Sequence, residues 1–467
     1  MTAENPPKLK WTVLLYMAGD NNLSEECVYS LTMIREALPE NSTKLAVLAQ
    51  FDPAGVRAQT KRYRLRAGKT LNEDAAATGW KAQETYSGEP QNLLDFVRWG
   101  ISTYPAEHYM VVLVGHGSGT DDDFVLHDDN PPGALSIHDL RYVFERLTDD
   151  GHTIDILGFD TCVMSMCEVC FELLRTNVIY MVGSEGFSPN TGWPYKEILE
   201  ELSNRLEGKP TINEDVSQAQ VLARQIVYEY RKFYEPYING GISVDQSVLQ
   251  VKKIDEVKKR MFVMVGDLLD EFKAGDLDYG TEKQNAMLLA HWETQSYNGE
   301  MFVDLYDFCN CLAERYKKLA KPSKVIESSK AVQDAISDLV VRTCVAGPAF
   351  QFSYGISIYF PWAVLGPSYG NLGFAKESRW IDFLKLYHTN TRRLAKGWNE
   401  HERLPFRITA PWNKGRDGHV ESMRNPPVED PRFACSDVTP PAAETSNSSD
   451  PKEATLRTTK VNKRRAG

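Results

Sequence analysis

The sequence predicts an α/β fold in which a mostly parallel β-sheet is covered by helices on both faces. Short, predominantly apolar runs alternate with amphipathic helical patterns, as they do when strands are buried on both sides. The chain has 467 residues, of which 42% are hydrophobic, and a net charge of −11. This composition allows a sizeable core and excludes a disordered or fibrous protein. Eight cysteines are too few for a disulfide scaffold.

Six apolar runs are predicted to form the strands. Each is predominantly apolar and lacks a regular amphipathic alternation, which indicates a buried strand. In chain order they are Thr12–Met17, Leu45–Phe51, Tyr109–Val114, Ile154–Phe159, Val178–Val182 and Ile242–Val244. Right-handed crossovers between parallel strands would place functional side chains at the carboxyl ends of these strands.

Helix-start signals lie between and after these runs. Ser136 with Asp139 forms a capping-box-like pair, and Thr211 with Glu214 would open a helix that continues through Tyr230. Three further helical stretches and one strand-like run follow in the second half of the chain. They are Ile254–Phe272, Phe302–Tyr316, Val325–Val341 and the strand-like Tyr354–Pro361.

The chain is predicted to have three parts. Residues 1–250 form the α/β core, residues 251–390 form a helical extension with a further strand that packs on the core, and residues 391–467 form a tail rich in Pro, Ser and basic residues. The tail carries a net charge of +5, which leaves −16 for the remainder. Because the tail has too little apolar content to offset the entropy of ordering, we expect it to be largely disordered.

Charge and hydropathy narrow the classes of function. An acidic protein lacks the basic surface that nucleic-acid phosphates require, so nucleic acid is not an expected partner. No stretch approaches the ~18 apolar residues of a membrane span. The run Trp11–Ala18 is too short for the apolar region of a signal peptide. We therefore expect a cytoplasmic protein, with export by another route and the oligomeric state left open.

Two predicted strands end in loops that carry residues suited to covalent catalysis. One strand stops at glycines and presents His116 beside Gly117, and another presents Cys162 just before a predicted helix. A thiol near a helix N-terminus and an imidazole has its thiolate favoured, which makes it nucleophilic. The N–H groups of Gly117 and Cys162 are candidates for an oxyanion hole. If the strands are neighbours, a Cys-His dyad that acts through a thioester acyl-enzyme is predicted.

An ordered series of motifs runs from residue 11 to about residue 390. The motifs are Trp11–Leu23, Val114–Gly117, Gly158–Glu168, Gly192–Tyr195, Val303–Leu305 and Ile356–Pro361. In these motifs the sequence resembles the clostripain-like cysteine peptidases, relatives of caspases, legumain, gingipains and separase. The resemblance implies a caspase-like fold for the core and a cysteine endopeptidase that cleaves peptide or protein substrates after Arg or Lys.

The resemblance also implies roles for single residues. His116 matches the family histidine that orients the scissile peptide and protonates the leaving amine, and Cys162 matches the nucleophile. Asp160 matches the acid that lines the pocket for a basic side chain, and a carboxylate there offers a guanidinium group a bidentate partner. From its position after a strand, Glu185 is a further candidate to line the cleft.

Two features depart from the family pattern. Members often carry an acid just before the Gly-Trp-Pro-Tyr segment, where this chain has the neutral Asn190 and Thr191. If that position completes the pocket, the preference for Arg or Lys is weakened. Residues 118–135 contain no Lys or Arg, so we expect no activating cut after a basic residue in that loop.

The same loop is acidic. Its carboxylates are Asp121, Asp122, Asp123, Asp128 and Asp129. Carboxylates on a loop can hold Ca²⁺ through oxygen ligands, but EF-hand spacing is absent and we favour a solvated loop over a calcium site. The chemistry itself requires no cofactor.

Other interpretations of these motifs are weaker. Cys167 and Cys170 are predicted to pack in the core, and a zinc site that joins them to Cys162 and His116 lacks a repeated C-x-x-C pair. A phosphate-binding turn at 115–119 lacks both the required glycine pattern and the lysine. The main alternative to an enzyme is a caspase-like scaffold that binds peptides with little or no proteolysis.

Overall fold

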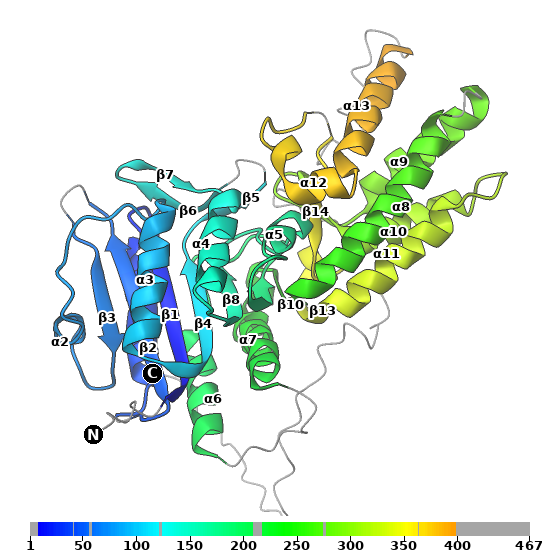
Figure 1. Cartoon of the computed structure of the whole chain (residues 1–467). Coiled ribbons are helices and arrows are strands. Elements are labelled where there is room, and N and C mark those ends of the chain that lie inside the picture. The colour runs from blue at the N-terminus through cyan, green and yellow to red at the C-terminus, as the bar shows by residue number, and fades with distance from the viewer. Residues whose placement is uncertain are drawn as a thin grey trace, which may run out of the picture. The chain divides into compact units, whose positions relative to one another are not determined.

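An eight-stranded β-sheet, with helices packed on it, forms the α/β core of the protein (Figure 1). The computed structural model describes residues 8–40, 42–55, 58–120, 124–208, 217–273, 277–362 and 364–397. All of these belong to the first of two units, Met1–Cys435. The strands of the sheet are β1 (Leu9–Gly19), β2 (Leu45–Pro53), β3 (Lys61–Leu65), β4 (Ala106–Val114), β8 (Ile154–Asp160), β9 (Val178–Gly183), β10 (Val244–Gln250) and β13 (Val340–Ala346).

The sheet has the order β13-β10-β9-β8-β4-β1-β2-β3. The strands β9, β8, β4, β1 and β2 pair in parallel, whereas the pairs β2–β3, β9–β10 and β10–β13 are antiparallel. This mixed, mostly parallel sheet confirms the predicted α/β class. The strand predicted at Ile242–Val244 instead begins at Val244 and runs to Gln250. Its polar residues Asp245 and Ser247 are buried and hydrogen-bonded, so hydropathy did not reveal the strand's length.

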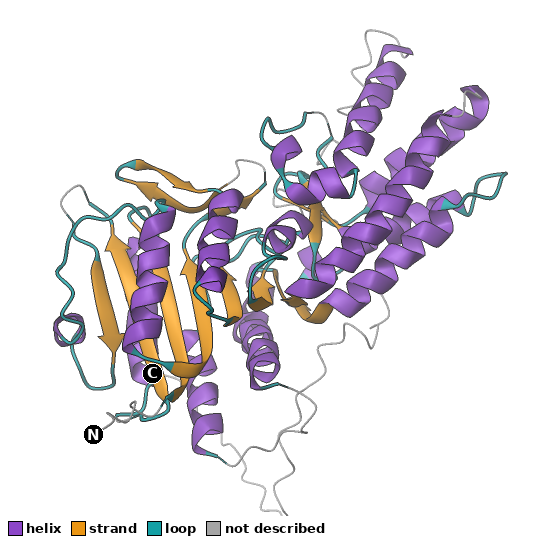
Figure 2. Ribbon diagram, in the orientation of Figure 1, coloured by secondary structure: helices purple, strands orange, loops and turns teal. Residues whose placement is uncertain are grey.

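Helices cover both faces of the sheet (Figure 2). On one face lie α3 (Pro90–Thr103), α4 (Ile137–Asp149) and α5 (Cys167–Glu172), and on the other lie α1 (Ser24–Ala37), α6 (Tyr195–Glu207) and α7 (Gln218–Tyr234). Successive residues of β1 point to opposite faces, as the pleat requires. Leu14 packs in the first cluster of apolar side chains, while Val13 and Leu15 pack in the second.

A predominantly helical region follows the core. Its helices are α8 (Ile254–Lys273), α9 (Leu277–Glu293), α10 (Leu305–Tyr316), α11 (Val325–Leu339), α12 (Gly373–Glu377) and α13 (Trp380–Gly397). A small antiparallel sheet accompanies them, with β12 (Phe302–Asp304) between β11 (Ser296–Tyr297) and β14 (Ser357–Tyr359). The chain returns to the central sheet at β13, which was predicted as the end of a helix.

The remaining elements are short. They are α2 (Leu71–Ala76), β5 (Gly117–Gly119), β6 (Phe124–Asp129), β7 (Pro132–Leu135) and the 3₁₀ turns η1 (Glu235–Gly240), η2 (Val251–Lys253), η3 (Pro348–Phe350) and η4 (Tyr369–Asn371). The strands β5, β6 and β7 form a third sheet.

Several predicted boundaries can be compared with the structure. The capping box before α4 is confirmed, because the Ser136 hydroxyl accepts from the Asp139 N–H and the Asp139 carboxylate accepts from the Ser136 N–H. Thr211 and Glu214 lie outside the described residues, and α7 begins at Gln218. α13 continues past residue 391 to Gly397, and the tail from residue 398 onward lies outside the described residues.

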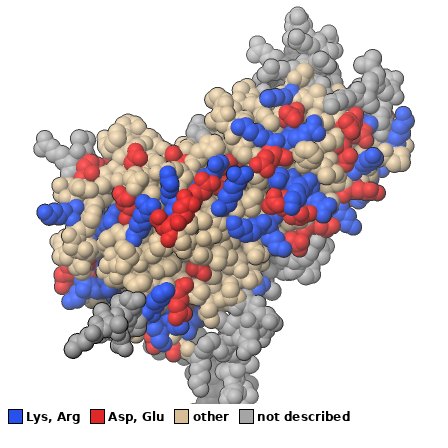
Figure 3. All heavy atoms as spheres, viewed as in Figure 1, with Lys and Arg blue, Asp and Glu red and all other residues tan. Residues whose placement is uncertain are grey.

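The surface that the structure describes carries both positive and negative side chains. On the face shown in Figure 3, Lys and Arg side chains are interspersed with Asp and Glu rather than gathered into one basic patch. None of the helices in the part of the chain that the structure describes is long and apolar enough to cross a membrane.

Candidate active site

The histidine and cysteine loops leave neighbouring strands. β4 and β8 pair in parallel, with Val114 opposite Asp160. The Gly115 N–H donates to the Asp160 carbonyl at 3.3 Å, which continues the pairing past the end of β4. His116 and Cys162 follow within two residues of these positions. The two loops therefore emerge from the same edge of the sheet.

Gly117 allows the two loops to touch. A Cβ atom at Gly117 would lie 2.7 Å from the Cys162 carbonyl oxygen and 3.2 Å from the Thr161 Cβ. Any larger residue would push the loops apart. The Leu126 N–H donates to the His116 carbonyl at 2.7 Å, while Gly117 lies opposite Val125. In an antiparallel ladder this makes Gly117 a non-hydrogen-bonded position, with its N–H turned away from β6.

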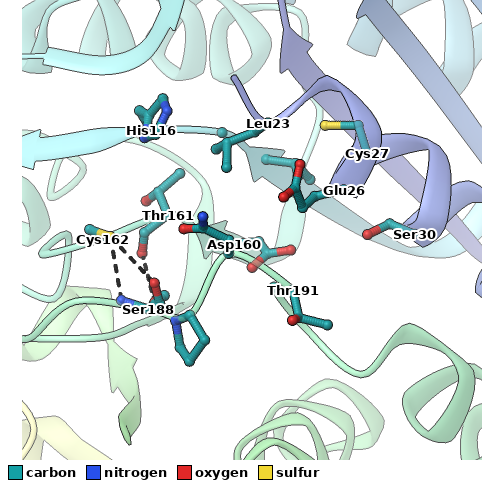
Figure 4. Close-up of a pocket in the computed structure, with 15 residues that line it drawn as sticks. Leu23, Glu26, Cys27, Ser30, His116, Asp160, Thr161, Cys162, Ser188 and Thr191 are labelled. Atoms are coloured by element: carbon teal, nitrogen blue, oxygen red, sulfur yellow. Dashed lines mark hydrogen bonds between the residues drawn. The ribbon is translucent and has the colours of Figure 1, made fainter. Parts of the chain in front are cut away.

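His116 and Cys162 line one pocket (Figure 4). The pocket walls come from the start of α1, the loop after β4, the end of β8 and the loop 188–192. The lining residues are Leu23, Glu26, Cys27, Ser30, Val114, Gly115, His116, Asp160, Thr161, Cys162, Ser188, Pro189, Asn190, Thr191 and Gly192. Asp160, Asn190 and Thr191 thus line the same pocket as the two loop residues, and their role in substrate binding stays a prediction. The contribution of α1, including Glu26, was not predicted.

The Cys162 thiol is partly buried against the loop after β9. Its Sγ accepts from the Ser188 N–H at 3.3 Å and lies 3.8 Å from the Ser188 carbonyl oxygen. Burial raises the pKa of the thiol, and the Ser188 N–H only partly opposes this effect. The prediction that a helix N-terminus would favour the Cys162 thiolate is wrong, because α5 begins five residues later, at Cys167, and is only six residues long. The side chain therefore rests as a thiol.

A sharp turn presents Cys162 to the pocket. Val163 has a φ of 49°, a conformation that β-branched residues adopt only when the surroundings enforce it. The Val163 N–H donates to the Gly186 carbonyl at 3.0 Å, and the Ser165 N–H donates to the Ser184 carbonyl at 2.8 Å. The loop after β9 thus holds the turn in place.

The His116 ring is half-buried and has one polar partner among the residues that the structure describes. Its Nε2 lies 2.7 Å from the Asn22 Oδ1. With Asn22 in this orientation Nε2 carries the proton, which leaves Nδ1 as an acceptor. Burial lowers the pKa of the imidazole, and His127 lowers it further while Asp129 opposes the shift. The ring is therefore neutral near neutral pH.

Asp160 both lines the pocket and holds its wall. Its Oδ2 accepts from the Trp193 N–H at 3.1 Å and from the Tyr195 hydroxyl at 2.7 Å. Burial raises the pKa of this carboxyl to about 6, against the opposing effect of these two donors. Gly192 has a φ of 72°, and a Cβ there would lie 2.7 Å from the Asp160 Oδ2. A glycine is therefore required where the wall passes over the carboxylate.

Glu185 does not line this pocket, contrary to expectation. It is fully buried, and its Oε2 accepts from the Gly355 N–H at 2.8 Å. Burial raises the pKa of its carboxyl, and the neighbouring Asp304 adds to the increase. Because β14 and its preceding loop cover the end of β9, this acid joins the core to the helical region.

The other predicted candidates have structural partners. Cys167 and Cys170 are buried free thiols, which confirms their packing role. Asp128 is buried and accepts from the N–H groups of Ser87 and Asn130, and Asp129 pairs with His127. Asp121, Asp122 and Asp123 lie outside the described residues. Among the described side chains no group of three or more His, Cys, Asp or Glu is arranged to hold a metal.

Comparison with known proteins gives a consistent family assignment. The model of the clostripain family matches residues 15–386. Clostripain from Hathewaya histolytica is 22% identical over 411 residues, which span 75% of this chain and 74% of that protein.

Solved structures share the fold. A secreted cysteine protease from Bacteroides thetaiotaomicron, in complex with an irreversible peptide inhibitor, superimposes with a TM-score of 0.57 at 17% identity and covers 80% of this chain and 99% of its own. An inactive zymogen protease from Parabacteroides distasonis gives a TM-score of 0.54 at 21% identity with the same coverage. Because the family model spans most of the sequence, this chain belongs to the clostripain family of cysteine peptidases.

Proposed function

We propose that this cysteine peptidase is an endopeptidase that cleaves after Arg or Lys, with Cys162 as nucleophile and His116 as general acid and base. The observation that carries the proposal is the contact between the two loops. Gly117 lies against the Cys162 carbonyl, and both reactive side chains line the same pocket. One scissile carbonyl placed there would be within reach of the thiol, the imidazole and the backbone N–H groups.

Acylation starts from the neutral pair. Cys162 Sγ attacks the scissile carbonyl carbon while its proton passes to the neutral His116, in keeping with a raised thiol pKa and a lowered imidazole pKa. The N–H groups of Gly117 and Cys162 donate to the oxyanion. His116 then gives its proton to the leaving amine as the C–N bond breaks, and the acyl group remains on sulfur as a thioester.

Deacylation reverses the roles. A water molecule loses a proton to His116 as its oxygen attacks the thioester carbonyl. The C–S bond breaks, the sulfur receives the proton from His116, and the carboxylic acid product leaves. Each cycle hydrolyses one peptide bond and restores the starting thiol without a cofactor.

Asp160 supports the preference for a basic residue. Its carboxylate is the last residue of β8, two residues before the nucleophile, and it lines the same pocket. A carboxylate in a partly dehydrated pocket forms charge-assisted hydrogen bonds with guanidinium or ammonium groups. The net charge of −16 over residues 1–390 would attract basic peptides over a longer range.

The test compares the native chain with Cys162→Ala on fluorogenic peptide amides that carry Arg or Lys before the scissile bond. We expect hydrolysis by the native protein and a loss of at least about a thousandfold in Cys162→Ala. Cys170→Ala, a nearby buried thiol on α5, is the matched control and should remain active. Unchanged turnover in Cys162→Ala would refute the dyad. Lack of turnover by the native protein on any substrate would support a peptide-binding scaffold.

A further inference from the structure

Glu26 is a second acidic side chain on the pocket (Figure 4). It lies in the first turn of α1, whereas Asp160 ends β8, so the two carboxylates come from different walls. The other pocket residues from this part of the chain, Leu23, Cys27 and Ser30, carry no charge.

One carboxylate oxygen of Glu26 is buried without a donor. Its Oε2 is shielded from solvent and has no hydrogen-bond partner among the described residues. Asp160 differs, because its Oδ2 receives two donors. A buried carboxylate oxygen without a donor is costly, and such groups indicate a missing partner. Glu26 as a whole is only partly buried and lines the pocket, so a turn of its carboxylate would let a bound ligand supply this partner.

The helix dipole does not account for this arrangement. An acid in the first turn of a helix is stabilised by the free N–H groups there. The exposed Glu25 occupies the same turn and satisfies that preference while its side chain stays in water. The dipole therefore explains an acid near the start of α1, but it does not explain an oxygen that is turned away from water at the pocket.

We propose that Glu26 is a specificity-determining residue that binds the guanidinium group of a P1 arginine together with Asp160. This inference rests on the proposed cleavage after basic residues. A guanidinium group presents five N–H donors in a plane, more than one partly occupied carboxylate can accept. Glu26 supplies the second charged acceptor from α1, since Asn190 and Thr191 on the loop are neutral. Because ammonium is compact and has three donors, the second carboxylate favours Arg over Lys.

The test measures kcat/KM for three peptide amides that differ only at P1, which is Arg, Lys or the neutral isostere citrulline. Glu26→Gln should lower the value for Arg by about ten- to hundredfold, mainly through KM, and should lower the value for citrulline, which keeps N–H donors but carries no charge, by much less. The loss for Lys should be smaller. Glu25→Gln is the matched control from the same helical turn and should change none of the three values.

The outcomes separate this inference from the function on which it rests. If the native protein does not prefer Arg or Lys to citrulline, the proposed basic specificity fails. The native protein could prefer Arg while Glu26→Gln keeps the same ratio of kcat/KM for Arg to kcat/KM for citrulline. That result would exclude Glu26 as a determinant and leave the proposed basic specificity standing. Glu26→Asp retains the charge on a shorter side chain and should recover part of the ratio. Equal ratios in Glu26→Asp and Glu26→Gln would also contradict a direct ionic contact.

Discussion

Asp160 and Glu185 occupy similar places on neighbouring parallel strands, yet only Asp160 reaches the pocket. Asp160 ends β8, and Glu185 follows the end of β9 by two residues. The loop 188–192 passes beside Asp160 and leaves it on the pocket wall. Over Glu185, the segment before β14 supplies the Gly355 N–H and closes the space. The position of an acid at a strand end thus makes it a candidate, and the segment packed above it decides whether substrate can reach it.

Two further buried acids, Asp245 and Asp304, lie near Glu185 and have structural roles. Asp245 accepts from the N–H groups of Glu185 and Gly186, and Asp304 accepts from those of Asp307 and Tyr354. These carboxyls are buried, and the donors to Asp245 come from the loop after β9, whereas those to Asp304 come from the helical region. The bond from the Gly355 N–H to the Glu185 carboxylate crosses between the two regions, which gives Glu185 a structural role.

The largest expected effect is on stability, and it distinguishes Glu185, which is buried between the two regions, from the acids of the pocket. Glu185→Ala should lower the free energy of unfolding by about 3 kcal/mol, because it leaves the Gly355 N–H without its acceptor and opens a cavity. Glu185→Gln keeps the volume and one acceptor, so it should cost about 1 kcal/mol. Urea unfolding measures both values. A Glu185→Ala protein of native stability that fails to cleave peptides would place Glu185 in the site instead.

The second effect concerns substrate selection. Asp160→Asn should lower kcat/KM for a P1 arginine by about a hundredfold relative to citrulline, since the pocket loses a charge-assisted partner. Because the pKa of Asp160 is raised to about 6, the native preference for arginine should weaken as pH falls through that value. Asp160→Asn should lack this pH dependence. Glu185→Gln is the control, and an equal loss of preference in that variant would remove the distinction between the two acids.

The third effect is on stability. The free energy of unfolding should fall as pH rises, whereas the arginine preference of the pocket should weaken as pH falls. Burial, with the charge of Asp307, raises the pKa of Asp304 to about 8. The folded state then keeps a proton that the unfolded state releases above pH ~4, so this contribution to stability is complete at low pH. It should be lost as pH rises towards 8, by up to ~1.4 kcal/mol per pH unit. Asp304→Asn should flatten the curve of unfolding free energy against pH, and an unchanged slope would exclude Asp304 as its source.

The smallest expected effect tests whether Asn22 orients the His116 ring in the pocket. Asn22→Ala removes the one hydrogen bond that the structure gives to the His116 Nε2. We expect kcat to fall by about three- to tenfold, with the ratio of arginine to citrulline unchanged. Asn22→Asp keeps an acceptor and should retain more of the activity. A change in P1 preference without a change in kcat would show that Asn22 acts in the pocket rather than on the imidazole.

Local sequence patterns predicted the central strands and the two reactive loops. The strands β1, β2, β4, β8 and β9 are predominantly apolar, and the glycines after β4 mark a strand end in the sequence itself. The edge strand β3 was missed because Lys61, Arg62 and Arg64 interrupt its apolar pattern. β13 was missed because no breaker separates Leu339 from Val340, where helix α11 passes directly into the strand.

The differences among the acids could not be predicted from the sequence. Glu185 and its donor Gly355 are 170 residues apart in the chain, so the cover over that carboxylate is a property of tertiary packing. Glu26 looks like an ordinary first-turn acid next to Glu25. Only the packing of α1 beside the end of β8 distinguishes the two and places Glu26 on the pocket.

Covalent labelling tests most directly whether Cys162 reacts in a pocket that selects a basic residue. The native protein would be treated with a peptidyl chloromethyl ketone that carries Arg at P1, and the modified residue would be mapped by mass spectrometry. We expect one adduct, on Cys162, that is absent in Cys162→Ala and forms much more slowly when citrulline replaces Arg. Labelling of Cys27 or another thiol in place of Cys162, or equal rates with both reagents, would contradict this expectation.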